Sequence, residues 1–312
     1  MRILFFGSAV IGFPVLEALL TSPADELVGV VTQPDRPGGR KLQTTPCPVK
    51  IFAQERGIPA FSPEKVGSPE SLDALQELAA DLFVVVAYGQ YIPQSVLAMP
   101  PSGSINLHPS LLPKYRGSSP IQWAIANGDA MTGVTILYVS EKMDAGDIIL
   151  QREVPIGPED NEQSMEPVLA RAGADLLMEA VTQIRSGSVS ARPQDETAAT
   201  EVRKLVKEDG RLDWTLSART LHNRIRAFIA WPGCFFEKPS AKGVKRVKVL
   251  RAQVEEGTGT PGELLDVSGD GPLVATGDGA LRLLEVQPAG KRAMDGAAYL
   301  RGHPLQPGDR LG

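Results

Sequence analysis

The stretch "DLFVVVAYG" (residues 81–89) is the strongest apolar run in the chain. It is short, rich in valine and closed by a glycine, which predicts a strand buried on both faces of a parallel sheet. Upstream, "RILFFG" (2–7) and "LVGVVT" (27–32) have the same character. Downstream, "GSINLH" (103–108) and "GVTILYV" (133–139) add further runs of this kind. Together these segments predict a single central sheet.

Helical spacing of apolar residues separates these strands. It occurs in "VIGFPVLEALL" (10–20), "VKIFAQERG" (49–57) and "PESLDALQELAA" (69–80). Strands that alternate with helices predict a Rossmann-like α/β domain, with a mainly parallel sheet and helices on both faces. Ligands bind such sheets beyond the carboxyl ends of the strands, and His108 lies at one of these ends.

The pattern changes near "SGSVSARPQDETAATEVRK" (186–204), which is polar, rich in small residues and typical of a linker. A helix is predicted over 217–229, and short apolar runs punctuated by glycine follow it. That rhythm predicts a small antiparallel β-barrel, similar to an OB-fold. We therefore expect a catalytic domain (1–188), a linker (189–206) and a carboxy-terminal barrel domain (207–312).

Composition narrows the class of protein. A length of 312 residues suffices for two domains, and a net charge of −5 gives no whole-molecule attraction to nucleic acid or membrane. Cys47 and Cys234 have no paired spacing, which fits a reducing compartment without a metal cluster. The apolar run at the start is too short for a secretory signal, and no stretch reaches the length of a membrane span. We expect a cytoplasmic protein.

The stretch "SINLHPSLLPKYRGSSPIQWAI" (104–125) carries one of only three histidines. On an extended chain Asn106 and His108 project to the same side. The amide can stabilise a developing oxyanion, and the imidazole can transfer protons near neutral pH. Asp144 or Asp147, after the strand at 133–139, can hold the imidazole. No serine or cysteine has a nucleophile signature, so direct attack by a substrate amine or hydroxyl on an activated carbonyl suits this set.

Spacing alone leaves another interpretation open. Asn106 can form an Asx turn, and His108 can satisfy a backbone carbonyl. The loop "GSAVIG" (7–12) lacks the glycine spacing of a dinucleotide site and the Gly-Lys-Ser/Thr of a phosphate loop. It is typical of a tight strand-to-helix turn, and its sequence disfavours a nicotinamide-dependent dehydrogenase.

Two longer motifs resemble the signature of folate-dependent formyltransferases: "NLHPSLLPKYRGSSPIQWAI" (106–125) and "GVTILYVSEKMDAGDII" (133–149). Three further stretches are similar to the methionyl-tRNA formyltransferase family. They are "VTQPDRPGGRKLQTTPCPVK" (31–50), "KEDGRLDWTLSARTLHNRIRAFIAWPGCFF" (207–236) and "LRLLEVQPAGKRAM…RG" (281–302). The resemblance thus runs, in order, over nearly the whole chain.

The resemblance implies transfer of a formyl group from the cosubstrate 10-formyltetrahydrofolate to the amino group of methionyl initiator tRNA. The product serves translation initiation, and no metal takes part. By the same resemblance the catalytic residues are Asn106, His108 and Asp144. Folate contacts carry over to Ser110, Leu111, Leu112 and Pro113. The end of the strongest strand, with Tyr88 and Gly89, is a further candidate wall for the folate ring.

The predicted tRNA contacts fall into two groups. The insertion 31–50, with Arg36, Arg40 and Lys41, is expected to probe the end of the acceptor stem. Residues 201–251 hold 13 Lys/Arg against five acids, a net charge of +8. Such a surface can position the stem through phosphates without reading its sequence. Its candidate contacts are Arg203, Lys204, Lys207, Lys245, Arg246 and Lys248. We expect a monomer.

Two rival functions remain at this point. A formyltransferase acting on a small amine, such as an amino sugar or a ribonucleotide, would keep the catalytic trio but would need neither the insertion nor a basic second domain. An RNA-binding protein with a catalytically silent sheet domain would not need the trio of Asn106, His108 and Asp144.

Overall fold

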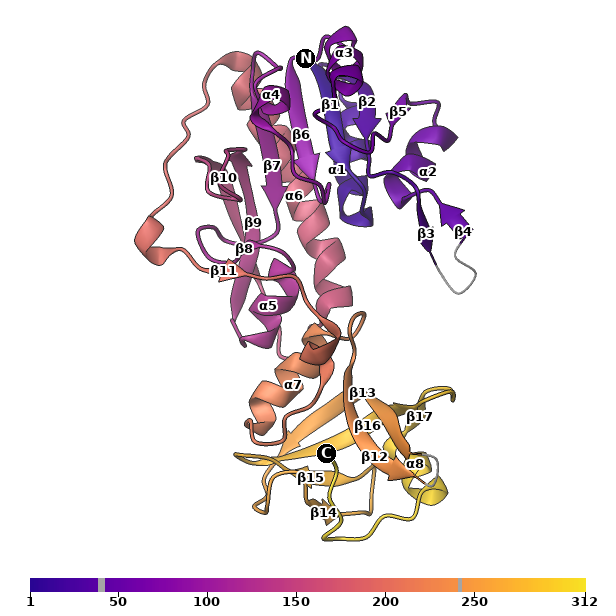
Figure 1. Ribbon diagram of the computed structural model, residues 1–312. Helices are drawn as coiled ribbons and strands as arrows, with labels where there is room; N and C mark the ends of the chain where they lie inside the picture. Colours follow the sequence, from indigo (N-terminus) through magenta and orange to yellow (C-terminus); the bar gives the residue numbers. More distant parts are fainter. Residues whose placement is uncertain (39–42, 241–242) are drawn as a thin grey trace. The chain divides into compact units, whose positions relative to one another are not determined.

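The computed structural model describes residues 1–38, 43–240 and 243–312. The chain divides into two compact units, each assembled from separate segments (Figure 1). The first unit contains residues 1–117, 131–155 and 166–202, and the second contains residues 118–130, 156–165 and 203–312. Among the helices that the structure describes, none has the length and apolar character to cross a membrane.

The first unit is built on a seven-stranded sheet in the order β10-β9-β7-β6-β1-β2-β5. Its central pairs from β5 to β7 are parallel, whereas β9 and β10 are antiparallel to their neighbours. All residues of β1 after Arg2 are buried, as expected for a strand covered on both faces. The strands are β1 (Arg2–Gly7), β2 (Glu26–Val31), β5 (Ala60–Phe61), β6 (Leu82–Val86), β7 (Ser104–His108), β9 (Met131–Tyr138) and β10 (Ile148–Pro155).

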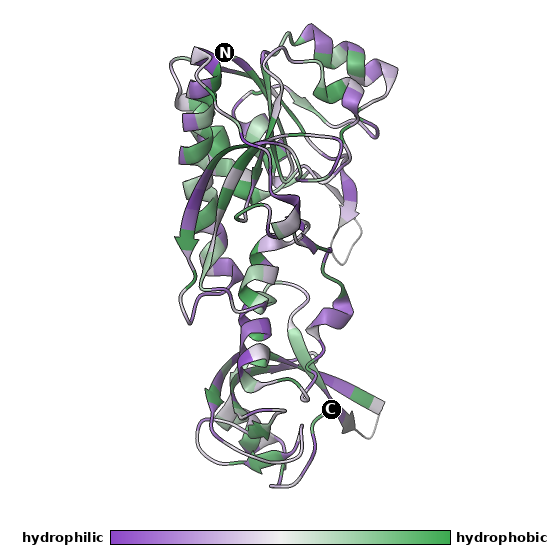
Figure 2. Ribbon diagram, turned by 90° about the vertical axis from the view of Figure 1, so that its left-hand side faces the viewer, coloured by the Kyte–Doolittle hydropathy of each residue, from purple (hydrophilic) through white to green (hydrophobic). Residues whose placement is uncertain are grey.

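Helices pack against this sheet. Figure 2 shows its strands mostly in the hydrophobic colour and mixed hydrophobic and hydrophilic bands along the helices. In the long helix α6, a Cβ on Gly173 would lie only 2.6 Å from the side chain of Leu107 in β7. The helix therefore approaches the back of the strand that carries His108. The helices are α1 (Phe13–Thr21), α2 (Pro48–Glu55), α3 (Pro69–Glu77), α4 (Gln94–Leu97) and α6 (Glu162–Ser186).

The shorter strands of the first unit form two small ladders. β3 (Arg36–Gly38) pairs with β4 (Gln43–Thr45) inside the insertion 31–50. β8 (Arg116–Gly117) pairs in parallel with β11 (Glu201–Val202), so residues distant in sequence lie side by side.

The second unit combines helices α5 (Pro120–Ala126) and α7 (Ala218–Ala227) with an antiparallel sheet. The sheet runs in the order β12-β13-β16-β15-β14, with β17 paired to β16, and α7 packs on β13 and β16. Its elements are β12 (Cys234–Ser240), β13 (Gly243–Glu255), β14 (Leu264–Asp266), β15 (Leu273–Ala275), β16 (Ala280–Pro288), β17 (Met294–Asp295) and α8 (Gly296–Gly302). The predicted fold class, a mainly parallel α/β sheet followed by a small antiparallel β domain, is confirmed.

Candidate functional site

The candidate catalytic side chains lie at the carboxyl end of β7. Asn106 and His108 alternate along this strand with Ile105 and Leu107, which are buried in the core. Since successive side chains of a strand point to opposite faces, the two polar residues share one face. The apolar residues anchor the strand, and the polar pair is left at its end to meet the loop that follows β9.

Asp144, in that loop, joins the pair through its carboxylate. Asn106 Nδ2 donates to Asp144 Oδ1 at 3.2 Å. The backbone N–H of Gly117 donates to Oδ2 at 2.9 Å. The same Oδ2 lies 3.6 Å from His108 Nδ1. The structure thus brings Asn106, His108 and Asp144 together, whereas the side chain of Asp147 is exposed.

The two ring nitrogens of His108 have different partners. Nε2 lies 2.8 Å from the carbonyl oxygen of Tyr115. A carbonyl can only accept, so Nε2 is the donor in this contact and carries a hydrogen. The contact with a backbone carbonyl, expected under the alternative interpretation, is therefore present, but it leaves Nδ1 free to face Asp144.

Gly117 can present its N–H to Asp144 because of its backbone. Its φ is +102°, and a Cβ there would lie 2.4 Å from the carbonyl oxygen of Val202. Only glycine satisfies both conditions. Asp144 itself has a φ of +51°, a left-handed conformation that is uncommon outside glycine.

The predicted folate contacts follow the ends of β6 and β7, which are neighbours in the sheet. Ser110 is fully buried and donates to the carbonyl oxygen of Lys114 at 2.7 Å. Leu112, between Leu111 and the cis-bonded Pro113, is buried beside Leu137 and Ile148. These residues hold the loop after His108 in place, and their contact with folate stays a prediction.

Tyr88 and Gly89 lie after the end of β6. The Tyr88 ring meets Phe6 edge to face at 5.5 Å, and burial raises the pKa of its phenol to about 12. Gly89 has a φ of +78°, and a Cβ there would lie 2.1 Å from Gln33 Nε2. Because of its raised pKa, Tyr88 stays neutral within the core. Contact of this turn with folate also stays a prediction.

Of the tRNA contacts predicted in the first unit, only one lies within the described residues. Arg36 is exposed on β3, whereas Arg40 and Lys41 lie outside the described residues.

In the second unit the Lys and Arg side chains predicted to contact tRNA differ in whether they form an ion pair within the protein. Arg203 forms an ion pair with Asp209, and its guanidinium lies 5.5 Å from the centre of the Trp123 ring. Arg246 donates to Glu237 at 3.1 Å. The side chains without an ion pair in the described part of the chain are exposed: Lys204, Lys207, Lys245 and Lys248.

Lys245 stands directly opposite Lys238 across β12 and β13. Like charges at such positions destabilise a strand pair unless an anion lies between them.

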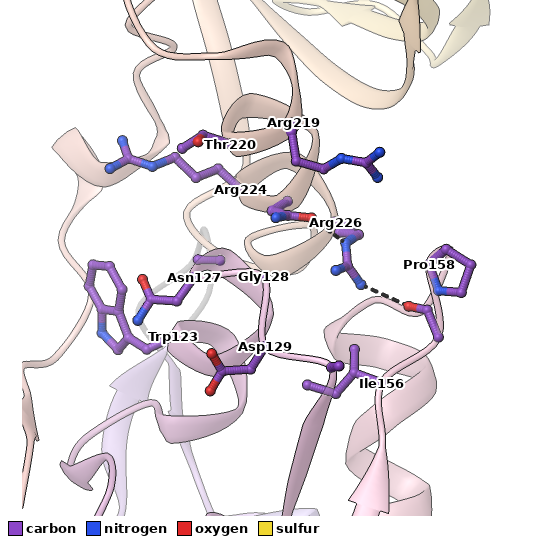
Figure 3. A pocket seen from close by; sticks show the side chains of 14 residues that line it. Trp123, Asn127, Gly128, Asp129, Ile156, Pro158, Arg219, Thr220, Arg224 and Arg226 are labelled. Atoms are coloured by element: carbon purple, nitrogen blue, oxygen red, sulfur yellow. Dashed lines mark hydrogen bonds between the residues drawn. The ribbon is translucent and has the colours of Figure 1, made fainter. Parts of the chain in front are cut away.

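A cavity of about 610 Å³ lies entirely within the second unit (Figure 3). Arg226, on its wall, donates to the carbonyl oxygen of Gly157 at 3.2 Å and also to that of Asp160. Arg219 and Arg224 extend in opposite directions in Figure 3, so the cations do not converge on one point. The cluster of candidate catalytic side chains, Asn106, His108 and Asp144, lies instead in the first unit.

Three polar residues around the loop after His108 were not singled out in the sequence as site candidates. Arg116 is buried within the "KYRG" stretch, and its guanidinium binds Gln194 and Glu196. Gln194 and Glu196 lie in the segment predicted to be a linker, where polar residues are expected to be solvated. A conventional motif search cannot find them because their partners are about 80 residues away.

Comparison with known proteins shows which family the chain belongs to. Residues 1–181 match the formyl transferase family model, and residues 204–304 match the model of the formyl transferase C-terminal domain. A methionyl-tRNA formyltransferase of Citrifermentans bemidjiense is 41% identical over 100% of this chain and 96% of its own length. One from Synechococcus sp. (strain JA-2-3B'a(2-13)) is 44% identical over 100% and 98%.

Solved structures share the fold at lower identity. The sugar 3N-formyl transferase WlaRD has a TM-score of 0.66 and 18% identity, and the match covers 94% of this chain and 99% of that protein. HypX from Aquifex aeolicus, in complex with tetrahydrofolic acid, has a TM-score of 0.61 and 21% identity. That match covers 100% of this chain but 50% of HypX. At these identities the likeness concerns the fold alone.

The amide, imidazole and carboxylate that converge at the end of β7 lie within the region matched by the formyl transferase model. Together with the full-length similarity to curated relatives, this places the chain in the methionyl-tRNA formyltransferase family of formyl-transferring enzymes.

Proposed function

We propose that the chain transfers the formyl group of 10-formyltetrahydrofolate to the amino group of methionyl initiator tRNA. The observation that carries the proposal is the cluster of Asn106, His108 and Asp144 at the end of β7. The cluster occurs in a chain that is 38–44% identical, over its full length, to proteins named methionyl-tRNA formyltransferase. The two rival functions, a small-amine formyltransferase and a silent RNA-binding protein, are not favoured by these relatives.

The proposed reaction is a direct transfer. The methionyl nitrogen attacks the formyl carbon, and the carbonyl electron pair moves to oxygen to give a tetrahedral oxyanion. The bond from this carbon to the folate nitrogen then breaks. The attacking amine loses one proton, and the departing folate nitrogen gains one, so the proton count balances.

The three side chains fit these steps. Asn106 Nδ2 has two hydrogens, and only one of them is used by Asp144, so the other can serve the oxyanion. Nδ1 of His108 lies 3.6 Å from Asp144 Oδ2, beyond hydrogen-bond distance, so an imidazolium hydrogen on Nδ1 can also serve the oxyanion. We assign to the Asp144 carboxylate the orientation of this imidazolium and the transfer of the amine proton to the leaving nitrogen.

For tRNA binding, we assign phosphate contacts to the exposed lysines of the second unit. The opposed pair Lys238 and Lys245 supports this assignment, because a phosphate between them would relieve their repulsion. Selection of the initiator is assigned to the insertion 31–50, where Arg36 is exposed. Arg40 and Lys41 are included in this assignment from the sequence.

We also propose that the enzyme works as a monomer in the cytoplasm. All three catalytic side chains come from one compact unit of a single chain, which supports a monomer. The two free cysteines, Cys47 and Cys234, support a reducing compartment.

The test is incubation of the purified chain with formyl-labelled 10-formyltetrahydrofolate and one acceptor at a time. The acceptors are methionyl initiator tRNA, methionyl elongator tRNA, an amino sugar and a ribonucleotide amine. We expect label on the initiator tRNA above all others. Preferential labelling of a free small amine would refute the proposed acceptor, and absence of transfer to every acceptor would refute the enzymatic function.

A further inference from the structure

The segment 192–202, here named the strap, lies along the catalytic loops of the first unit. At one end Arg192 and Ile148 exchange backbone hydrogen bonds of 2.8 and 2.9 Å. At the other end, Thr200 binds the loop that contacts His108 and Asp144. The Tyr115 N–H donates to Thr200 Oγ1 at 2.8 Å, and the Arg116 N–H donates to its carbonyl oxygen at 2.8 Å. The strap is therefore attached on both sides of the site.

Gln194, within the strap, uses its whole amide group. Nε2 donates to the carbonyl oxygens of Asp144 and Gly146, each at 2.8 Å. Oε1 accepts from Arg116 Nε at 3.0 Å and from Nη2 at 2.8 Å. An amide nitrogen has two hydrogens and its oxygen two lone pairs, so every position is occupied. This side chain joins the backbone on either side of Ala145 to Arg116.

Arg116 in turn is held from the strap. Its side chain is only 3% exposed, and a buried guanidinium requires a paired anion. Glu196 supplies it through two hydrogen bonds, of 2.7 and 3.2 Å, and also accepts from Lys142 at 2.8 Å. Hydrogen bonds from Arg116 and Lys142 lower the pKa of Glu196 to about 2, so the anchor stays charged at neutral pH.

Asp144 needs such support because of its backbone. A left-handed φ at a residue other than glycine is strained and persists only where the surroundings enforce it. Among the side chains of the described residues, only that of Gln194 donates a hydrogen bond to the Asp144 carbonyl. Gly117, Asn106 and His108 contact the carboxylate at the other end of the same residue.

We propose that Gln194 is a positioning residue for formyl transfer: held by Arg116 and Glu196, it fixes the Asp144 backbone so that the carboxylate faces Asn106 and His108. The inference rests on the proposed function for the identity of the reaction. It predicts that the strap acts on turnover and not on substrate binding, since Gln194 itself contacts only protein groups.

Two substitutions test whether Gln194 positions the Asp144 backbone or only supplies a hydrogen-bond acceptor to Arg116. Gln194→Met removes both kinds of hydrogen bond. Gln194→Glu keeps an acceptor for Arg116 but replaces the two N–H donors to Asp144 and Gly146 with a carboxylate oxygen. Thr197→Val is the matched control, because the Thr197 hydroxyl donates only to Asp195 within the strap. Each variant is measured for kcat, for KM toward both substrates, and for deuterium exchange of the peptide covering 140–147.

We expect both Gln194 variants to lose about 10²-fold in kcat, since a misplacement of about 1 Å has that effect, with KM changed less than about threefold. Exchange in 140–147 should rise in both and stay at the parent level in Thr197→Val. A Gln194→Glu variant with the parent's kcat and exchange would overturn the proposal. If the parent itself transfers no formyl group, the proposed function fails, and the exchange measurement still decides whether Gln194 holds the loop.

Discussion

His108 Nε2 donates to the carbonyl oxygen of Tyr115 at 2.8 Å, which leaves Nδ1 on the side of Asp144. Tyr115 is joined to the strap through Thr200, so the orientation of the imidazole depends on a segment that follows α6. A flip of the imidazole ring would break the buried hydrogen bond from Nε2 to the Tyr115 carbonyl oxygen. Nδ1 is therefore the ring nitrogen that faces Asp144, and the predictions for His108 and Asp144 depend on that arrangement.

His108→Ala should lower kcat by about 10²–10⁴-fold, because it removes a positioned proton-transfer group. The apolar residues of β7, Ile105 and Leu107, remain buried, so we expect the fold to persist. Formylation kinetics and circular dichroism check the two parts. His303→Ala, which changes a histidine of the second unit, is the control. Near-parental turnover in the His108 variant would remove His108 from the catalytic set.

Asp144→Asn should reduce kcat by at least about 10²-fold with little change in KM, since the shape is kept and the charge facing Nδ1 is lost. The amide oxygen can still accept from Gly117, so stability should change little. Asp147→Asn is the control, because that side chain is exposed. If Asp147→Asn abolishes turnover and Asp144→Asn does not, the catalytic carboxylate is Asp147.

Replacement of Lys245 and Arg246 by Ala should weaken binding of initiator and elongator methionyl-tRNA alike. Each lost contact with a duplex phosphate should flatten the log–log salt dependence by about 0.9. Tighter or unchanged binding at low salt would show that β13 does not contact the tRNA.

Arg40→Ala should instead lower kcat/KM for the initiator more than for the elongator, because the insertion is assigned to selection of the acceptor. Both tRNAs are compared at two salt concentrations. Equal losses for the two tRNAs would show that Arg40 supplies only charge.

His222, in α7, should make the stability of the second unit sensitive to acid. Burial lowers the pKa of this imidazole below its ordinary value of 6.5, an effect that Arg226 and Arg219 reinforce and Glu159 opposes. As the pH falls below 6.5, the unfolded chain takes up the proton first. The stability contributed by neutral His222 is therefore fully present above that pH and is lost as the pH falls through the lowered pKa.

The measurement compares Tm at about pH 7.5 and about pH 5.5 for the parent and for His222→Gln, which does not titrate in this range. The Tm of the parent should fall more between the two pH values than the Tm of the variant. An equal or larger decrease in the variant would show that His222 does not link folding to protonation.

The sequence predicted the elements that depend on local pattern. The run at 82–86 becomes β6 because five consecutive apolar residues can be buried only in a strand covered on both faces or in a longer helix, and glycine follows too soon for the helix. Asn106 and His108 share a face because a strand has a period of two, a property that needs no tertiary contact. The antiparallel direction of β9 was beyond this reasoning, since a buried run reads the same in either direction.

By itself, then, the sequence determined which residues of β7 project together and which family the motifs resemble. It also determined the positions of β1, β2, β6, β7, β9, α1, α2, α3 and α7, whereas β10 and the long helix α6 had no prediction. Only the tertiary structure decided that Asp144 and not Asp147 faces His108, and that the carbonyl oxygen of Tyr115 accepts a hydrogen bond from Nε2. It also decided that Gln194, 50 residues beyond Asp144, holds the Asp144 carbonyl. The physical reason is that periodicity and turn preference act between neighbours in the chain. The partners of a buried polar group are set by which backbone segments the packed core brings within 3 Å, about the length of a hydrogen bond.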